Sequence, residues 1–370
     1  MKRVKFISIL LALCMILSFG AGCSGSNGSN DNGNDKAGAT TAEGDQTEQT
    51  GNAETIVFTD SAGREVEVPA EITRIAPSGS LAQIVLLALA PEMFVGLPNQ
   101  FSGDAEQFID PEYFNLPVLG HLYGAKDLNL EEIAKVNPQI IIDVGESKSS
   151  VVEDMDTIQE QVKIPAVHIA ASTTTMPEAY RTLGKLLGKE EEAEVLASYC
   201  DEVYNKMLDI MEDVGEDNKV GVLQLAGEDG LNVIGKGSFH AEILDIISDN
   251  LAVLESPTGK GLGDPVDIER IAIWNPEVIL FAPGSIYDTV AENPAWKDID
   301  AIKTGRYYEI PGTPNSWMGS PPSVNRYIGI LWALKILYPE HAEYDMFEET
   351  ARYYKLFYHC DLTEEQYEEL

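Results

Sequence analysis

A repeated segment constrains the fold of this chain more than any other feature of its sequence. Residues 130–145 read LEEIAKVNPQIIIDVG, and residues 268–283 read IERIAIWNPEVILFAP. Proline disfavours helix in the residue before it, so Asn137 and Asn275 are each predicted to end a helix and to precede a buried strand. The repeat therefore predicts two copies of one α/β unit and, with them, two similar lobes.

One long helical pattern stands between the two copies. Apolar residues recur at helical spacing over residues 190–213, and at 1.5 Å per residue this helix is roughly 36 Å long. That length is typical of a strut between lobes. We expect an N-terminal lobe at 54–188, a linking helix at 189–214 and a C-terminal lobe at 215–370.

Short apolar strands alternate with helical patterns in both predicted lobes. A hairpin with the polar turn DSAGR at residues 60–64 comes first, and a helix is predicted at 81–90. The other strands are predicted at 74–77, 94–97, 140–144, 166–170, 220–225, 231–234, 278–282 and 306–310. This alternation favours an α/β fold of two Rossmann-like lobes, each with a mostly parallel sheet covered by helices, and a ligand cleft between them.

The N-terminus has the pattern of an export signal. Three cations precede an apolar run at 6–19, which is too short to span a membrane, and small residues then lead to Cys23. The pattern predicts a lipoprotein signal peptide at 1–22 with Cys23 lipidated, and a plain cleaved signal is the alternative. Residues 23–53 are polar and typical of a flexible tether. We therefore expect an extracytoplasmic protein, anchored by lipid to the outer face of the cell membrane.

Charge and cysteine content exclude several classes of function. Asp and Glu number 61 against 25 Lys and Arg, which gives a formal net charge of −36 at pH 7. Such a surface repels nucleic acid and anionic lipid headgroups, and an anionic ligand needs a local cluster of donors. Cys200 and Cys360 are the two thiols after the tether, so we expect at most one disulfide and no zinc cage. Whether the two thiols pair stays open.

Several motifs, in order and spacing, resemble one known family. They are DSAGR at 60–64, the two repeated segments, the long helix, GSF at 237–239, SPPSVNR at 320–326 and the tail at 354–358. Over residues 54–370 the chain resembles the helical-backbone, class III substrate-binding lipoproteins of bacterial ABC importers. Members of that family capture ferric siderophores, haem, cobalamin, molybdate or tungstate.

The resemblance implies a monomeric receptor that is not an enzyme and holds no resident cofactor. Such a receptor delivers its ligand to a permease of two membrane subunits, which works with an ATPase. Members of the family dock through one glutamate per lobe, and the repeated segments assign this role to Glu131 and Glu269, with Glu132 as a substitute. Stabilisation of the two helix starts by these carboxylates is the alternative role. The ligand is expected to be a ferric siderophore or a related metal chelate.

The segment before the last long helix is the strongest candidate for ligand contact. Ser320 followed by two prolines predicts a helix start, whose free N–H groups favour anionic oxygen. Arg326 adds a planar charged donor, and Trp317 and Met318 precede it, where they would pack on a flat ligand. The full set of predicted contacts, which adds residues on strand-end loops, is Ser78, Ser80, Asn99, His121, Tyr123, Lys236, Phe239, His240, Tyr287, Trp317, Met318 and Arg326.

Other ligands and other classes of protein stay open from the sequence. A molybdate or tungstate receptor would need only hydroxyls and cations, such as Ser78, Ser80, Lys236 and Arg326. Haem, a corrinoid, or a metal ion held directly by histidines are further alternatives. A cell-surface α/β enzyme is less favoured, because no nucleophile motif is recognisable. An adhesion or sensor lipoprotein would bind a ligand without a permease.

Overall fold

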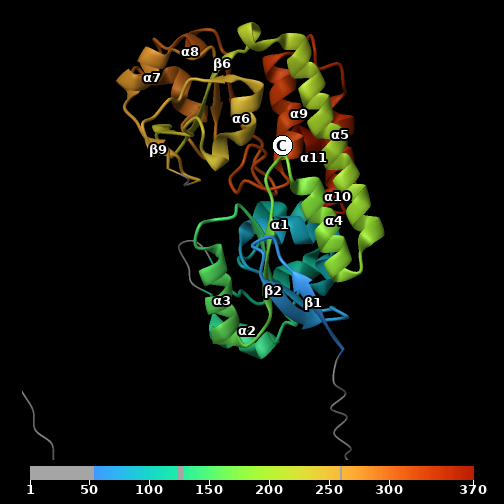
Figure 1. Ribbon diagram of the computed structural model, residues 1–370. Helices are drawn as coiled ribbons and strands as arrows, with labels where there is room; N and C mark the ends of the chain where they lie inside the picture. Colours follow the sequence, from blue (N-terminus) through green and yellow to red (C-terminus); the bar gives the residue numbers. More distant parts are fainter. Residues whose placement is uncertain (1–53, 123–127, 259–260) are drawn as a thin grey trace, which may run out of the picture. The chain divides into compact units, whose positions relative to one another are not determined.

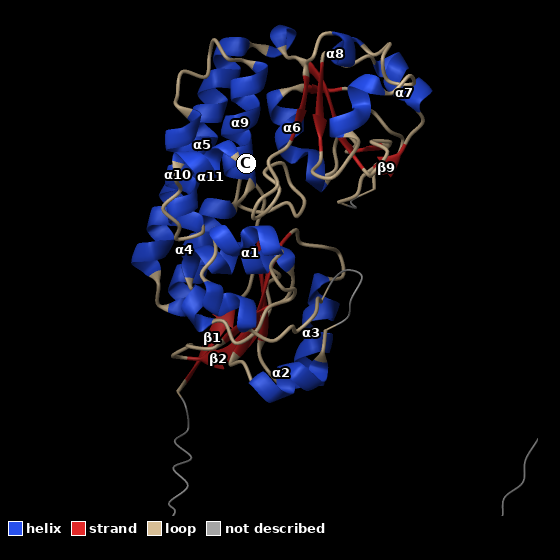
Figure 2. Cartoon of the chain, turned by 180° about the vertical axis from the view of Figure 1, so that it is seen from behind, coloured by secondary structure: helices blue, strands red, loops and turns tan. Residues whose placement is uncertain are grey.

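The computed structural model describes residues 54–122, 128–258 and 261–370. The predicted signal peptide, the tether, Cys23 and Tyr123 lie outside these ranges. The described residues belong to one unit, Asn52–Leu370, in which two α/β lobes are joined along one side by a layer of helices (Figures 1 and 2). No helix within the described ranges is both long and apolar enough to cross a membrane.

The N-terminal lobe begins with the predicted hairpin. Strands β1 (Thr55–Thr59) and β2 (Glu65–Pro69) pair antiparallel. In the turn between them, Asp60 accepts a hydrogen bond from the backbone N–H of Arg64. The Nη1 atom of Arg64 donates to Asp60 and to the carbonyl of Ala166, each at 2.9 Å. The Asp-Arg pair therefore ties the hairpin turn to the edge strand of the neighbouring sheet.

A parallel sheet in the order β3-β4-β5 forms the centre of the N-terminal lobe. Its strands are β3 (Ile75–Pro77), β4 (Ile140–Gly145) and β5 (Ala166–Ala170). The surrounding helices are α1 (Ser80–Leu89), α2 (Leu130–Val136) and α3 (Val151–Val162), with 3-10 turns η1 (Pro91–Met93), η2 (Gly103–Gln107) and η3 (Pro111–Asn115). The strand predicted at 94–97 is wrong. Its two end residues form only isolated bridges, with Ile75 and Val118, because each pairs with a different partner.

Two helices lead out of the N-terminal lobe and make the link. Helix α4 (Met176–Leu187) ends at the left-handed Gly188, and α5 (Glu190–Val214) follows. The two helices pack closely where Gly184 faces Ala193, since a Cβ on the glycine would lie 2.5 Å from the alanine Cβ. Helix α5 has 25 residues and so measures about 38 Å. It begins at the first residue of the helical pattern at 190–213 and ends one residue after that pattern, at the predicted end of the 189–214 segment.

The last helices of the chain return to this layer. They are α9 (Arg326–Leu337), α10 (Met346–Phe357) and α11 (Glu364–Glu368), which lie along α5 (Figure 1). Leu86 of α1, Val203 of α5, Leu331 of α9 and Phe357 of α10 belong to one buried core. The segment after the C-terminal lobe therefore packs against both the linking helix and the N-terminal lobe.

The C-terminal lobe has a mixed sheet in the order β11-β10-β6-β7-β9, with β8 beside β6. Its strands are β6 (Gly221–Ala226), β7 (Asn232–Val233), β8 (Asp249–Asn250), β9 (Asp264–Pro265), β10 (Val278–Phe281) and β11 (Tyr307–Glu309). Its helices and 3-10 turns are η4 (Glu216–Asn218), η5 (Phe239–Ala241), α6 (Glu242–Ile247), α7 (Ile268–Trp274), η6 (Tyr287–Glu292) and α8 (Asp300–Lys303). Strand β7 pairs antiparallel with β6 and β9, whereas β6, β8, β10 and β11 are parallel.

The repeated segment forms the same unit in both lobes, as predicted. Helices α2 and α7 each have seven residues, and each is capped by a side chain, that of Asn129 or Asp267, which accepts the N–H three residues on. Each helix ends at an asparagine in the left-handed conformation, with φ of 45° at Asn137 and 43° at Asn275. Asparagine tolerates this conformation, and the proline after it prevents helix from continuing.

Candidate ligand-binding site

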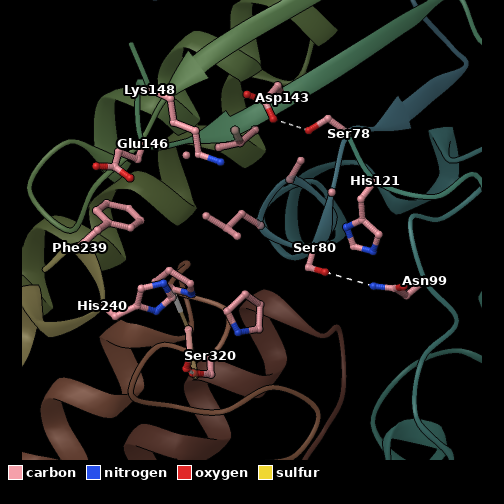
Figure 3. Close-up of a pocket in the computed structure, with 18 of the residues that line it drawn as sticks. Ser78, Ser80, Asn99, His121, Asp143, Glu146, Lys148, Phe239, His240 and Ser320 are labelled. Atoms are coloured by element: carbon pink, nitrogen blue, oxygen red, sulfur yellow. Dashed lines mark hydrogen bonds between the residues drawn. The ribbon is translucent and has the colours of Figure 1, made fainter. Parts of the chain in front are cut away.

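A pocket of about 740 Å³ opens between the two lobes (Figure 3). Segments from both lobes line it, and most of the N-terminal ones follow the carboxyl ends of β3 and β4. In α/β proteins this end of the sheet is where ligands gather. The lining residues are Ser78, Gly79, Ser80, Leu81, Ala82, Asn99, His121, Asp143, Val144, Gly145, Glu146, Lys148, Phe239, His240, Gly261, Leu262, Ser320, Pro321 and Pro322.

The N-terminal wall of the pocket is polar. Ser78 and Ser80 lie where β3 gives way to α1, and among the described residues no side chain caps this helix. Its first N–H groups therefore face the pocket, at the positive end of the helix dipole. Ser80 Oγ accepts a hydrogen bond of 3.2 Å from Asn99 Nδ2. Figure 3 shows Lys148 extending toward the interior of the pocket from the segment after β4.

A hydrogen-bonded chain of side chains supports this wall from behind. Ser78 Oγ donates to one oxygen of Asp143, and His168 Nδ1 lies 2.7 Å from the other. His168 Nε2 is in turn 3.0 Å from Ser147 Oγ. Asp143 is 6% exposed and His168 is fully buried, so the carboxylate is held rigidly at the pocket surface. His168 is thus a satisfied core histidine.

The C-terminal wall is more apolar. Phe239, Leu262, Pro321 and Pro322 contribute carbon surface, and the Leu262 side chain is largely exposed. His240 joins them, with its Nδ1 atom 3.0 Å from the carbonyl of Gly319. Figure 3 shows Phe239, His240 and Ser320 across the pocket from Ser78 and Asp143. The two walls therefore offer different chemistry to one ligand.

The pocket brings together about half of the contacts predicted from the sequence. Those that line it are Ser78, Ser80, Asn99, His121, Phe239 and His240. Those that lie elsewhere in the described structure are Lys236, Tyr287, Trp317, Met318 and Arg326. Tyr123 lies outside the described residues.

The five contacts that lie elsewhere have other partners. Trp317 and Met318 are each 1% exposed and pack in the largest core. Tyr287 packs on rings of the C-terminal lobe, and burial raises its pKa. Lys236 pairs with Asp249 at 3.2 Å.

Arg326 is 2% exposed and pairs with Glu242. Burial lowers the pKa of Arg326 to about 10, while Glu242 opposes that shift. The helix predicted to start at Ser320 begins instead at Arg326. The start of this helix, at Asn325 and Arg326, is therefore buried, whereas Ser320, Pro321 and Pro322 before it line the pocket. The residues that do not line the pocket are Lys236, Tyr287, Trp317, Met318 and Arg326, and none of them is proposed as a ligand contact.

Sequence reasoning missed the pocket residues at the carboxyl end of the repeated strand. Asp143 lies in the last half of β4, and Glu146 and Lys148 follow the strand, at the end where ligands bind. In the second copy, Phe281 stands in the place of Asp143. The polar Asp143 in an otherwise apolar strand therefore distinguishes β4, which lines the pocket, from β10, which does not.

The described residues hold no cluster of three or more His, Cys, Asp or Glu side chains that would bind a metal ion. Cys200 is buried and Cys360 is partly buried, and the two thiols form no disulfide with each other in the described structure.

The comparisons with known proteins agree with this geometry. The sequence profile of the periplasmic binding protein family matches residues 120–314, more than half of the chain. The chain therefore belongs to the periplasmic binding protein family, whose members bind solutes outside the cytoplasm.

The individual proteins that this chain matches share low sequence identity with it. The chain is 22% identical over 314 residues to the Fe(3+)-citrate-binding protein YfmC of Bacillus subtilis, covering 83% of this chain and 89% of that protein. It is also similar to an ABC transporter solute binding protein from Sulfurospirillum deleyianum, with 25% identity, a TM-score of 0.78 and coverage of 85% and 98% of the two chains. The molybdate-bound MolA of Haemophilus influenzae shares the fold, with 20% identity, a TM-score of 0.66 and coverage of 83% and 99%.

Proposed function

We propose that this protein is the solute-binding receptor of an ABC importer and that its interlobe pocket captures a ferric chelate. The observation that carries the proposal is the pocket itself, with about 740 Å³ between one polar and one apolar wall. Pockets of this size suit a small organic molecule. A bare metal ion or a tetrahedral oxyanion would leave most of the space unfilled.

The two walls suggest how a chelate would be oriented. Its oxygen-rich, metal-bearing part would face the N-terminal wall, where the start of α1, Ser80 and Lys148 offer donors. Its carbon-rich part would face Phe239 and Leu262 on the other wall, where burial of apolar area adds affinity. The name of the relative YfmC, an Fe(3+)-citrate-binding protein, supports iron as the metal. The metal is then cargo, and the protein needs no resident cofactor.

A molybdate or tungstate receptor is the second candidate, supported by the shared fold of molybdate-bound MolA. Fewer donors for an oxyanion line the pocket than the sequence predicted. Of the four donors expected for an oxyanion, Ser78 and Ser80 line the pocket, whereas Lys236 and Arg326 are paired with carboxylates elsewhere. A haem or corrinoid is a further alternative.

The partners follow from the same role. Glu131 and Glu269 are the second residues of α2 and α7, and both side chains are exposed. Matched, exposed carboxylates on the two lobes support docking of a monomeric receptor on a permease of two membrane subunits, with its ATPase.

The signal pattern and Cys23 support a lipid anchor, which metabolic labelling with an alkyne fatty acid tests. Loss of the label in Cys23→Ala supports the anchor, and labelling that persists argues against it.

Isothermal titration calorimetry tests the proposed ligand class. The purified protein is titrated with ferric citrate, ferric siderophores, haem, cobalamin, molybdate and Zn²⁺. We expect a ferric chelate to bind in the micromolar range or tighter, with the iron-free chelator binding more weakly. Tight binding of molybdate alone would move the assignment to the second candidate. Turnover of a bound ester or amide, without binding of any chelate, would favour the enzyme alternative.

A further inference from the structure

A buried ion pair lies directly behind the apolar wall of the pocket. Arg326, at the start of α9, is 2% exposed, and its Nη1 atom lies 2.7 Å from Glu242 Oε2. Glu242 begins α6, and its side chain is 21% exposed. A buried guanidinium requires a partner of this kind, since an unpaired charge in the core is strongly unfavourable.

The same carboxylate reaches the opposite lobe. Glu242 Oε2 accepts hydrogen bonds from the backbone N–H of Thr173 at 3.1 Å and from its hydroxyl at 2.8 Å. Thr173 lies between β5 and α4 of the N-terminal lobe and is 2% exposed. The phenol of Tyr327, the residue after Arg326, donates to the carbonyl of Thr173. Glu242 of α6 thus accepts from the N–H and hydroxyl of Thr173, and Tyr327 of α9 donates to its carbonyl.

The ion pair also fixes the pocket wall. Arg326 Nη2 donates to the backbone carbonyl of Phe239, and the guanidinium carbon lies 4.8 Å from the centre of the Phe239 ring. Gly319 packs on the other side, where a Cβ would lie 3.2 Å from Arg326 Nε. The carbonyl of that glycine is the partner of His240 Nδ1. Phe239 and His240 both line the pocket (Figure 3). Arg326 does not line it, so it contacts the wall from the buried side.

We propose that Arg326 and Glu242 are positioning residues for the ligand, which set the place of the Phe239–His240 wall relative to the N-terminal lobe without touching the ligand. The inference rests on the proposed function, because it takes this pocket as the ligand site. The pair couples three elements, namely α9, the wall and Thr173. Ligand affinity therefore depends on an ion pair whose two residues do not line the pocket. Removing one charge releases the wall and the lobe contact together.

The test compares this pair with a second Arg–Glu pair in the same chain. Arg352 and Glu202 form two hydrogen bonds of 2.7 Å between α10 and α5, with side chains 44% and 46% exposed. Glu202→Gln is the matched control for Glu242→Gln. Affinity for a ferric chelate is measured by calorimetry, and hydrogen exchange is followed in the peptides that contain Thr173 and Phe239.

We expect Glu242→Gln to weaken the chelate by roughly 10- to 100-fold, the range seen when supporting residues of metal sites are lost. Exchange should rise in both peptides of the free protein, whereas Glu202→Gln should change neither quantity. Unchanged affinity and exchange in Glu242→Gln would overturn the inference. If Glu242→Gln does not fold, Thr173→Val gives a milder variant that removes one hydroxyl, with the same expectation in direction. A wild-type protein that binds no chelate refutes the proposed function, whereas the exchange result still decides the positioning role.

Discussion

The two copies of the repeated unit have the same backbone and different uses. Helix α2 and strand β4 in one lobe match α7 and β10 in the other, down to the left-handed asparagine between them. Asp143 near the end of β4 and Lys148 after it line the pocket. The matching positions at the end of β10 and after it are Phe281 and Ile286, which pack in the core of the C-terminal lobe. The two copies therefore share one backbone scaffold, and the side chains at the end of one strand form the polar wall.

The C-terminal wall comes from other parts of its lobe. Its residues belong to η5, to the segment around Leu262 and to Ser320–Pro322 before α9. These segments have short or irregular backbone, and Arg326 contacts η5 from behind through Phe239. The N-terminal wall is thus set by regular strand ends and the C-terminal wall by contacts with buried side chains. This difference predicts which substitutions change stability and which change binding.

Replacing Trp317 with Ala should have the largest effect on stability. Its side chain is 1% exposed and belongs to the core that joins the helical layer, so we expect a loss of about 3–5 kcal/mol in the free energy of unfolding. Chemical denaturation measures this loss. Affinity of the folded fraction should stay within about twofold, because Trp317 does not line the pocket of the described residues. A loss of affinity without a loss of stability would return Trp317 to the ligand site.

Asp143→Ala should be the most destabilising change on the polar wall. It leaves the hydroxyl of Ser78 and the imidazole of His168 without their shared acceptor, both in a buried place. Unpaired buried donors cost about 1–3 kcal/mol each, so we expect a loss of about 2–4 kcal/mol. Phe281→Leu, at the matched position of the other copy, is a packing control with an expected loss of about 1 kcal/mol. A smaller loss for Asp143→Ala than for this control would remove the supporting role of Asp143.

The two walls should contribute separately to binding. Phe239→Ala removes apolar contact and should weaken a ferric chelate by roughly 1–3 kcal/mol. Lys148→Ala removes one charged donor, and we expect roughly 0.5–1.5 kcal/mol. Calorimetry of both single variants and of the double variant tests whether the two effects add, as they should for distant sites. Strong non-additivity would show that the walls act as one unit and not as two.

Glu131→Ala and Glu269→Ala should have the smallest effect on the isolated protein. Each carboxylate lies in the first turn of its helix, where the dipole interaction is worth about 0.3–1 kcal/mol. Ligand affinity should not change. Uptake by cells that contain the importer should fall, most in the double variant, if the two lobes dock through these residues. Normal uptake by the double variant would leave both residues with helix capping alone.

Local patterns in the sequence predicted the repeated regular elements well. Strand β5 and helix α5 begin at the predicted residues, and the asparagine ends of α2 and α7 follow from a two-residue motif. The strand predicted at 94–97 was wrong because pairing depends on partners far along the chain. The spacing of apolar residues and the residues that end helices decide where an element begins. Whether a strand pairs depends on its neighbours in space.

The candidate site shows the same limit. Ser78 and Ser80 were predictable because they stand between the strand predicted at 74–77 and the helix predicted at 81–90. The burial of Arg326 was not predictable, because it depends on an ion pair with Glu242, which lies more than 80 residues earlier in the chain. A cationic side chain near a helix start looks the same in sequence whether it meets a ligand or a buried carboxylate. Only the packing of α6 against α9 separates the two.

Anomalous diffraction at the iron absorption edge, from crystals grown with a saturating ferric chelate, tests the central claim most directly. The account predicts one strong iron peak inside the interlobe pocket, on the side of Ser80 and Lys148, with the carbon part of the chelate against Phe239. An iron peak outside this pocket would contradict it. So would an empty pocket in crystals of a protein that calorimetry shows to be saturated.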